Sequence, residues 1–291
     1  MLLAAPNFSE GRNLNAIAEI EAAFAAQTAV LDRHSDAVHN RSVLTLSARA
    51  GDLSQALEHG ALACRERIDL DLHQGAHPRI GALDVCPVIW LDESDREAAR
   101  AEALATAIAI AALEIPVFLY GDSASIDERR ERAFFRRGGL AELTERMRSA
   151  RLKPDFGPPQ PHPTAGATLV TARPPLVAFN LLLDTADVEV ARAAAAQLRE
   201  AGGGLPGVRA IGIDLDGRAQ VSTNIHDPAS VPLGVVIQRV RELAAEHGAR
   251  ATSGEVVGLV PEAALADLPD DPPLEGFDPA TGVLERRLRL P

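Results

Sequence analysis

Two strand-like runs follow one another in TAVLDRHSDAVHNRSVLTLS, residues 28–47, with only a polar connection between them. β-Branched and aliphatic residues are frequent in both runs, 28–32 and 43–47, as is typical of strands. On either side, over 14–27 and over 53–68, apolar residues recur at helical spacing. Two adjacent strands enclosed by two helices form the middle of a β-α-β-β-α-β unit.

Apolar runs at 2–5 and 85–91 supply the outer strands of this unit. Its order predicts the ferredoxin-like, or split βαβ, arrangement, in which two helices cover one face of an antiparallel sheet. A helix over 94–114 and a strand over 117–120 extend the unit. The charged stretch 127–150 is interrupted by two glycines, so we expect two exposed helical pieces there, with charges that mostly face solvent.

Prolines crowd the middle of the chain, at positions 154, 158, 159, 161 and 163. They exclude a helix or a central strand and favour a stiff, extended path, which is typical of a linker. We therefore expect an N-terminal subdomain over 1–165, which includes a proline-rich linker from 151, and a C-terminal subdomain over 166–291.

The second subdomain repeats the alternation of the first. Strands are expected at 167–172, 176–183, 208–215, 220–225 and 255–260, and helices at 186–201 and 233–246. The predicted fold class is therefore α+β, with two ferredoxin-like (split βαβ) subdomains that face each other across a ligand-binding groove.

The composition restricts the partners of the protein. Its 291 residues carry 41 acidic and 29 basic side chains, a formal charge of −12 that opposes binding to nucleic acid or to an anionic membrane. Aromatic residues make up 3%, too few for platforms that stack single-stranded bases. Two cysteines, no secretory-type leader and no apolar run long enough for a membrane helix predict a reduced, cytoplasmic protein.

Histidine chemistry is concentrated in DLDLHQGAHPRIGALDVCPV, residues 69–88. His73 and His77 have the spacing of helical zinc ligands, but Gly75 and Pro78 interrupt any helix, so a metal pair is disfavoured. A loop of glycine, proline and arginine instead suits the presentation of the His77 imidazole to a substrate. Since an imidazole exchanges protons near neutral pH, the pattern predicts a general acid/base.

A second polar stretch, DRHSDAVHNRSV at 32–43, joins the two central strands. Titratable groups gathered at strand ends are typical of catalytic and binding sites. Polar residues are equally common in solvated turns, so this connection could be either a functional site or a solvent-exposed turn.

Segments in order along nearly the whole chain resemble the formiminotransferase domain, the glutamate formimidoyltransferase family. They are PNFSEGRN at 6–13, HNRSV at 39–43, GAHPRIGALDVCPV at 75–88, PVFLYG at 116–121, PDFGP at 154–158, GAT at 166–168, LVAFN at 176–180, AQVSTNI at 219–225 and VGLVP at 257–261. Their joint specificity is high, although each alone is a weak signal.

The resemblance implies transfer of the formimino group from N-formimino-L-glutamate to tetrahydrofolate, a co-substrate, as a step of histidine degradation. It also implies two ferredoxin-like subdomains around a folate-binding groove, and no metal is expected. Vertebrate members are fused to a cyclodeaminase, for which 291 residues leave no room, so we expect a stand-alone transferase.

The resemblance also implies site residues. The family's catalytic histidine lies in an HPR motif that maps onto His77. Its folate-contacting segment maps onto Gly157, Pro158, Pro159, Gln160, Pro161, His162, Pro163, Thr164, Ala165 and Gly166. Further substrate-binding candidates in the matching motifs are Asn7, His39, Asn40, Arg41, Arg79 and Asp84.

Charge suggests roles for some of these candidates. Anionic carboxylates of the substrate and of the folate tail require arginines, for which Arg41 and Arg79 are the candidates. A cationic formimino group would be steadied by Asp36 or Asp84. For Arg41 and Asp84, an ion pair that fixes the loops is an equally open interpretation.

Three other functions remain open from the sequence. The first keeps the fold and moves a formyl group from N-formylglutamate or 5-formyltetrahydrofolate. The second is a metal-dependent amidohydrolase that uses His34, His39, His73 and His77, and the third is a non-catalytic folate-binding module. The predicted partners are small molecules, with neither nucleic acid nor membrane, and the alanine-rich helix over 98–115 is a candidate homodimer interface.

Overall fold

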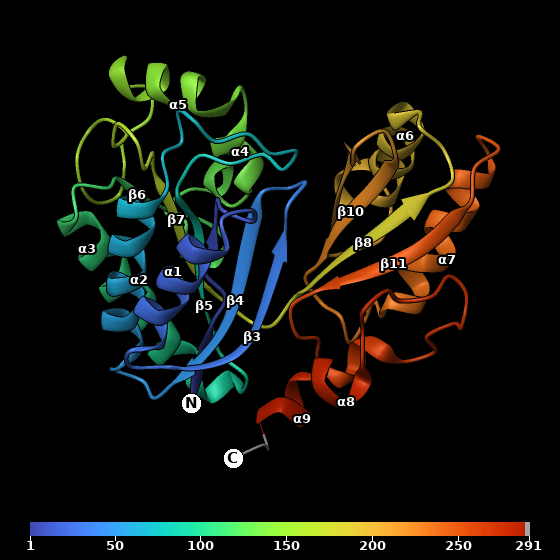
Figure 1. The fold of residues 1–291 in the computed structure, drawn as a ribbon, viewed down its shortest axis with the longest axis horizontal. Helices are drawn as coiled ribbons and strands as arrows, with labels where there is room; N and C mark the ends of the chain where they lie inside the picture. The colour runs from blue at the N-terminus through green and yellow to red at the C-terminus, as the bar shows by residue number, and fades with distance from the viewer. Residues whose placement is uncertain (289–291) are drawn as a thin grey trace. The chain divides into compact units, whose positions relative to one another are not determined.

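A computed structural model describes residues 1–288 and divides the chain into two compact units (Figure 1). The first unit comprises Met1–Pro174, and the second begins at Pro175. Each unit has its own sheet and its own apolar core. The predicted α+β class with two subdomains is confirmed, whereas a groove between them stays a prediction.

The first unit begins with the predicted β-α-β-β-α-β series. Its elements are β1 (Leu2–Ala4), β2 (Asn7–Phe8), α1 (Leu14–Ala25), β3 (Ala29–Asp36), β4 (Arg41–Ala48), α2 (Leu53–Arg67) and β5 (Leu83–Ile89). β1 and β2 both pair with β4 and β5, so they act as one interrupted strand. The antiparallel order β3, β4, β1/β2, β5 is the ferredoxin-like order, which confirms the predicted topology.

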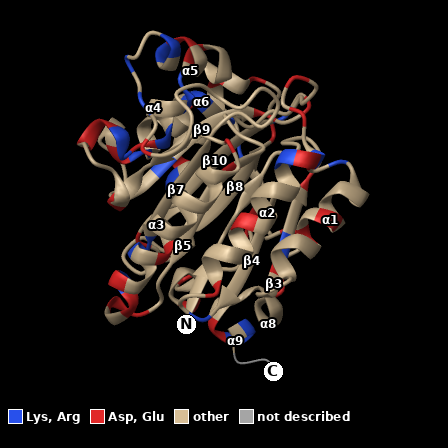
Figure 2. Ribbon diagram, turned by 90° about the vertical axis from the view of Figure 1, so that its left-hand side faces the viewer, with Lys and Arg blue, Asp and Glu red and all other residues tan. Residues whose placement is uncertain are grey.

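Helices α1 and α2 lie side by side on one face of this sheet (Figures 1 and 2). The side chain of Asn13 caps α1 by accepting hydrogen bonds from the backbone N–H groups of Asn15 and Ala16. A Cβ atom at Gly60 of α2 would lie 2.0 Å from the ring of Phe24. Glycine at this position therefore lets α2 approach the buried aromatic side chain of α1.

A mixed extension continues the first sheet beyond β5. Its elements are α3 (Arg96–Ala112), β6 (Val117–Leu119) and β7 (Thr168–Arg173). β7 lies between β5 and β6 and pairs parallel to both. The expectation that residues 167–172 belong to the second subdomain is therefore wrong, since the structure places the division after Pro174.

The proline-rich stretch packs within the first unit and does not act as a linker. The carbonyl of Phe156 accepts a hydrogen bond from Val117 N, and the carbonyl of Ala165 accepts one from Ala82 N, each at 2.9 Å. Gly166 forms an isolated bridge with Gly81. Prolines lack an N–H but keep their carbonyls, so an extended proline-rich segment still pairs through its acceptors and its non-proline residues.

Helices α4 (Arg132–Arg136) and α5 (Gly139–Arg148) are the two pieces expected in the charged stretch. They are not simply exposed. Phe135, Leu143 and Met147 join a separate apolar cluster that includes Phe118 and Leu169. The apolar side chains of the stretch thereby pack against the body of the unit, whereas none of the charged side chains of 127–150 is buried, in keeping with the expected solvated charges.

The second unit repeats the ferredoxin-like order. Its elements are β8 (Val177–Leu183), α6 (Val188–Leu198), β9 (Val208–Asp214), β10 (Ala219–Ile225), α7 (Leu233–Ala245) and β11 (Ala251–Val257). The strands are antiparallel in the order β11, β8, β10, β9. The last strand starts four residues before the predicted 255–260, and the other main elements agree with the expected ones.

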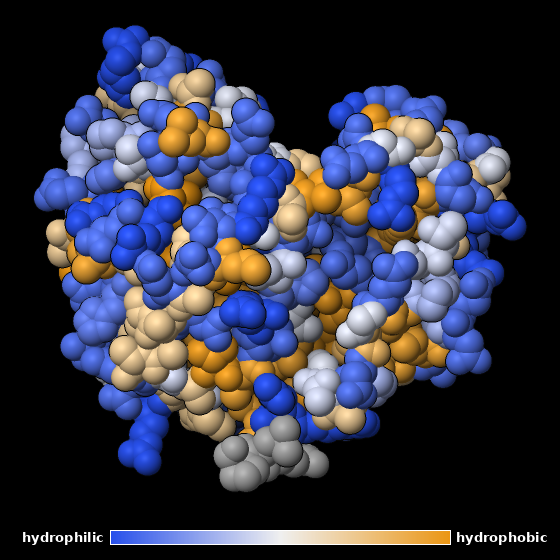
Figure 3. Space-filling model, viewed as in Figure 1, coloured by the Kyte–Doolittle hydropathy of each residue, from blue (hydrophilic) through white to orange (hydrophobic). Residues whose placement is uncertain are grey.

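Short elements complete the described chain. Single 3-10 turns occupy Glu93–Asp95, Gly121–Ser123, Asp127–Arg129, Glu200–Gly202 and Glu262–Leu265, and the tail holds α8 (Pro279–Gly282) and α9 (Leu284–Leu288). Hydrophilic and hydrophobic side chains are interspersed over the surface seen in Figure 3. Within residues 1–288, no helix combines the length and apolar character needed to cross a membrane.

Candidate functional site

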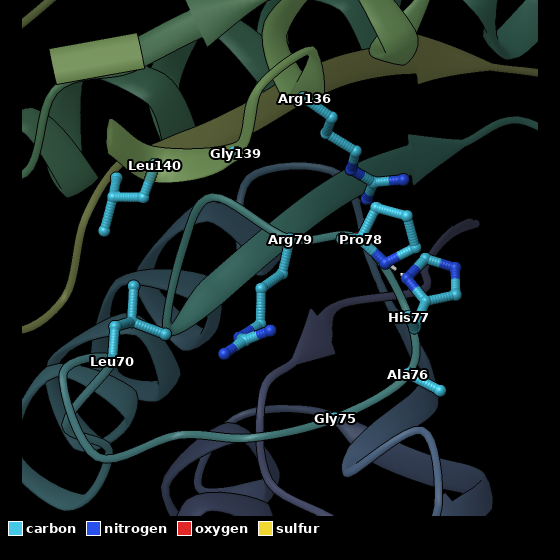
Figure 4. A pocket seen from close by; sticks show the side chains of 9 residues that line it. All are labelled: Leu70, Gly75, Ala76, His77, Pro78, Arg79, Arg136, Gly139 and Leu140. Carbon is cyan, nitrogen blue, oxygen red and sulfur yellow. Dashed lines mark hydrogen bonds between the residues drawn. The ribbon is translucent and has the colours of Figure 1, made fainter. Parts of the chain in front are cut away.

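A cavity of about 320 Å³ lies in the first unit, beside the loop that carries His77 (Figure 4). This volume is at the lower end of the range for sites that bind small molecules. The lining residues come from the loop after α2 and from the α4–α5 corner: Leu70, Gly75, Ala76, His77, Pro78, Arg79, Arg136, Gly139 and Leu140. Of the candidates predicted from the sequence, His77 and Arg79 are among them.

The turn between β3 and β4 holds the histidine loop in place. Asn40 lies in this turn and has a φ of 48°. Its Nδ2 donates a hydrogen bond to the carbonyl of Gln74, in the histidine loop, at 2.9 Å. Its Oδ1 accepts from Gly11 N at 2.8 Å, and its carbonyl accepts from His73 Nε2 at 2.9 Å. Asn40 therefore ties three segments together and acts as a positioning residue.

Glycine is required where the loop passes this turn. A Cβ atom at Gly75 would lie 2.3 Å from the carbonyl oxygen of His39, far inside normal contact. The next residue, Ala76, donates its N–H to the carbonyl of Val38 at 3.1 Å. The loop is therefore pressed against the β3–β4 turn immediately before His77.

The hydrogen bonding of His77 fixes one tautomer of its neutral ring. Nδ1 lies 2.8 Å from the carbonyl oxygen of Pro78, which only accepts, so Nδ1 carries the proton and Nε2 keeps its lone pair. Burial lowers the pKa of His77 well below its ordinary value, and the charges of Arg41 and Arg136 lower it further. The ring is therefore a neutral base near pH 7.

His39 lies next to this base. Its ring meets that of His77 edge to face, with centroids 5.9 Å apart. The backbone N–H of His39 donates to Asp36 Oδ1 at 2.6 Å. The Asp36 carboxylate thus closes the β3–β4 turn. The stretch 32–43, for which both a functional site and a solvated turn were open, therefore supports the histidine loop.

A buried ion cluster lies behind the loop. Asp84 is fully buried in β5, where Oδ2 accepts from Arg41 Nη1 at 2.8 Å and from Arg136 Nη2, while Oδ1 accepts from Ile80 N at 2.8 Å. Burial by itself would raise the pKa of Asp84, but the charges of Arg136 and Arg41 hold it well below its ordinary value. Burial lowers the pKa of Arg41 to about 10.

The remaining nitrogens of Arg41 are also engaged. Nε and Nη2 donate to Asn7 Oδ1 at 3.2 and 3.0 Å. Asn7 in turn donates to the carbonyl of Ala5 at 2.7 Å. Arg41, Asp84 and Asn7 line no part of the cavity, so the structure agrees with the ion-pair interpretation of Arg41 and Asp84.

Sequence reasoning missed Arg136. It comes from α4, lines the cavity and bonds to Asp84 across 52 positions of sequence. One available signal was the basic character of 129–153, which holds nine Lys and Arg against three Glu in an acidic chain. Nothing local in that stretch indicated which of its arginines turns inward.

The segment from Gly157 to Gly166 lies behind the cavity wall. The carbonyl of Thr164 accepts from the N–H of Leu70, a lining residue, at 2.9 Å. A Cβ atom at Gly166 would lie 2.1 Å from the carbonyl oxygen of Ile80. His162 Nδ1 accepts from Ala165 N at 3.1 Å. None of the ten residues lines this cavity, and their contact with folate stays a prediction.

Although His39 and His77 are neighbours, the four histidines considered as metal ligands do not form a metal site in the described part of the chain. Among residues 1–288, no group of three or more His, Cys, Asp or Glu side chains is placed to hold a metal ion. His73 Nε2 is bonded to the carbonyl of Asn40 rather than directed at His77. The helical spacing of the two histidines is not realised, because the chain between them forms a loop.

Two family models match the chain. Residues 1–173 match the formiminotransferase domain, N-terminal subdomain, and residues 178–270 match the formiminotransferase domain. The gap between the two matches brackets Pro174, where the two compact units divide.

Named relatives align over most of this chain. It is 37% identical over 289 residues to the glutamate formimidoyltransferase of Streptococcus pyogenes serotype M1, with 97% of each chain covered. Identity to the glutamate formimidoyltransferase of Thermoplasma acidophilum is 35% over 291 residues, covering 97% of this chain and 95% of that protein. The formimidoyltransferase-cyclodeaminase of Sus scrofa is 39% identical over 279 residues, which are 90% of this chain and 50% of that protein.

Proposed function

The chain belongs to the formiminotransferase domain family, and from this premise we propose that it transfers the formimino group of N-formimino-L-glutamate to tetrahydrofolate. The products are 5-formiminotetrahydrofolate and L-glutamate. The observation that carries the proposal is the tautomer of His77, whose Nε2 lone pair is available at the wall of a ligand-sized cavity.

His77 acts as general base and then as general acid. Its Nε2 takes the proton from N5 of tetrahydrofolate as that nitrogen bonds to the formimino carbon. It then returns the proton to the glutamate nitrogen as the bond between that nitrogen and the formimino carbon breaks. One proton moves from one nitrogen to the other, so the shuttle leaves His77 unchanged.

For the co-substrate, we propose that the segment from Gly157 to Gly166 contacts folate, as the family resemblance implies. Its support is its position next to the cavity wall. The Thr164 carbonyl accepts a hydrogen bond from Leu70, a lining residue, and Gly166 passes close to Ile80, the residue after Arg79. Asn7, His39 and Asn40 serve the substrate indirectly, by holding Arg41 and the histidine loop in place.

The deciding experiment mixes purified protein with formiminoglutamate and tetrahydrofolate. Acid treatment then cyclises the formimino product, and the cyclised folate is followed by its absorbance. We expect product only when both substrates are present. Binding of folate without any product would instead favour a non-catalytic folate-binding module.

Two further arms separate the other candidate functions. N-formylglutamate as donor tests formyl transfer, and we expect it to be much the poorer substrate. Chelation before assay tests the metal-dependent amidohydrolase, and we expect the rate to be unchanged. A rate that is lost on chelation and restored by a metal ion would contradict a metal-free mechanism.

We further propose a cytoplasmic enzyme that forms a homodimer through the outer face of α3. Leu104 and Ile108, one turn apart on this helix, are 45% and 53% exposed, so they form a small apolar surface that a second copy of the chain could cover. Sedimentation of the purified chain tests this directly, since a single monomeric species at micromolar concentration contradicts it.

A further inference from the structure

The ionised side chains at and behind the cavity wall carry more positive charge than their one carboxylate, that of Asp84, neutralises. Asp84 is shared by two guanidinium groups, those of Arg41 and Arg136. Arg79 adds a third at the wall, so three positive charges face one negative charge. Arg132, also on α4, adds to this field, and His77 stays neutral. This positive excess stands within a chain whose formal charge is −12.

Two of these arginines have donors that no protein group uses. Arg136 gives Nη2 to Asp84, and its other nitrogens have no hydrogen-bond partner within the described chain. Arg79 gives Nη2 to the carbonyl of His73, and that is its one bond among residues 1–288. Arg41, by contrast, has all three nitrogens engaged with Asp84 and Asn7.

Figure 4 shows how these side chains lie. The Arg136 guanidinium lies beside Pro78 and His77, and the Arg79 side chain, which also lines the cavity, extends away from them in this view. Both therefore border the space into which a substrate of His77 must fit. Asp84 fixes the Arg136 side chain, so its unbonded Nη1 is held in place before any ligand arrives, whereas its Nε is buried.

We propose that Arg136 and Arg79 form a carboxylate-binding subsite for the glutamyl part of the formimino donor, and that Arg41 only positions Asp84. The proposal rests on the proposed function. Glutamate carries two carboxylates, which match the two positive charges in excess. Guanidinium groups bind carboxylates through paired, charge-assisted hydrogen bonds, for which their planar geometry is suited.

Distance along the ligand favours the donor over the folate tail as the occupant. In formiminoglutamate, a single carbon atom separates the reacting nitrogen from the α-carboxylate. In tetrahydrofolate, an aminobenzoyl group separates N5 from the glutamyl carboxylates. A carboxylate bound next to the base His77 therefore belongs to the donor.

The test compares Arg136→Gln with Arg137→Gln, a matched control at the exposed neighbouring position. Because Arg136→Gln loses a charge-assisted hydrogen bond, we expect its KM for formiminoglutamate to rise roughly 10- to 100-fold. We expect the KM for tetrahydrofolate to stay within about twofold, and Arg136→Lys to recover part of the loss. Arg137→Gln is expected to behave as the wild type.

Formamidine, a donor without carboxylates, supplies the second arm. We expect the ratio of kcat/KM for formamidine to kcat/KM for formiminoglutamate to rise in Arg136→Gln, because only the second donor loses a carboxylate contact. An unchanged KM for formiminoglutamate overturns the proposal, and a raised KM for tetrahydrofolate alone assigns the arginines to the folate tail. Should Arg136→Gln fail to fold, as judged by its thermal melt, Arg79→Gln replaces it, since Arg79 makes no bond to Asp84.

Calorimetry with L-glutamate separates this proposal from the proposed function. If the wild type shows no formimino transfer at all, the proposed function fails, whatever glutamate does. Binding of glutamate that is weakened in Arg136→Gln, but not in Arg137→Gln, still supports the subsite. Equal binding to the wild type and to Arg136→Gln overturns it.

Discussion

His77 is the residue on which the proposed chemistry depends. Its Nδ1–H is held by the Pro78 carbonyl, which leaves Nε2 as the one nitrogen able to take a proton from a substrate. Replacement by alanine removes that base but none of the cluster formed by Arg41, Asp84 and Arg136. We expect His77→Ala to lower kcat by roughly 10²- to 10⁴-fold while folate affinity stays unchanged.

Steady-state kinetics and a folate-binding titration check this prediction together. Near-normal turnover in His77→Ala would remove the general acid/base assignment. A parallel loss of folate affinity would instead indicate that the imidazole binds folate rather than carrying its proton.

The pH dependence of kcat/KM reports the protonation of this base in the free enzyme. Burial, with the charges of Arg41 and Arg136, places the pKa of His77 well below its ordinary value of 6.5. The neutral, active form therefore persists as pH falls, and we expect the acid limb to lie below pH 6.5. Removing one positive charge in Arg136→Gln raises the pKa, so its acid limb should move to higher pH.

Profiles of the wild type, Arg136→Gln and Arg137→Gln measured with the same donor test this shift. The exposed charge of Arg137 is screened by solvent, so its removal should leave the limb in place. An acid limb at or above pH 6.5 in the wild type would contradict the lowered pKa.

For individual site residues, the sequence indicated which residue types belong to the site better than it indicated what each residue does there. The HPR motif identified His77 and Arg79, and both line the cavity. Arg41 and Asp84 were also candidates, but their roles depend on their partners in the folded chain, where they form an ion pair with each other. Arg136 was missed because its partner lies 52 positions away.

Among the elements, the contact between the histidine loop and the β3–β4 turn controls the site. Gly75 passes so close to His39 that a Cβ atom would stand 2.3 Å from its carbonyl oxygen. Alanine there must push the loop from the turn and move His77 with it. We expect Gly75→Ala to lower kcat at least about tenfold and stability by about 1–3 kcal/mol.

Gln74→Ala is the matched control, because this exposed side chain belongs to the same loop and its backbone carbonyl, which binds Asn40, is kept. Measurements of kcat and of thermal unfolding for both variants test whether Gly75→Ala alone lowers activity and stability. Wild-type kinetics in Gly75→Ala would mean that the loop accommodates the methyl group without moving His77.

For the whole molecule, the position of β7 sets the extent of the first unit. β7 pairs parallel with β5 on one side and β6 on the other, although it follows the proline-rich stretch in sequence. A fragment that ends at 165 lacks this strand, which leaves β6 without its sheet partner. We expect residues 1–174 to fold alone, and residues 1–165 to lack a cooperative transition.

Far-UV circular dichroism and thermal melting of the two fragments give the answer. Equal, cooperative melting of both would show that β7 is dispensable and would favour the earlier boundary that the prolines suggested. A fragment 1–174 that stays unfolded would mean that the first unit depends on the rest of the chain.

Local sequence patterns determined the two β-α-β-β-α-β series and the loop that presents His77. Helical and strand periodicity, and the effect of glycine and proline on a loop, act between residues only a few positions apart, so the order of residues reveals them. The insertion of β7 beside β5, the packing of the proline-rich segment into the first unit and the sharing of Asp84 by Arg41 and Arg136 were decided only by the tertiary structure. These contacts join distant segments, and each forms because folding buries groups whose hydrogen bonds and charges must then be satisfied by whatever lies nearby.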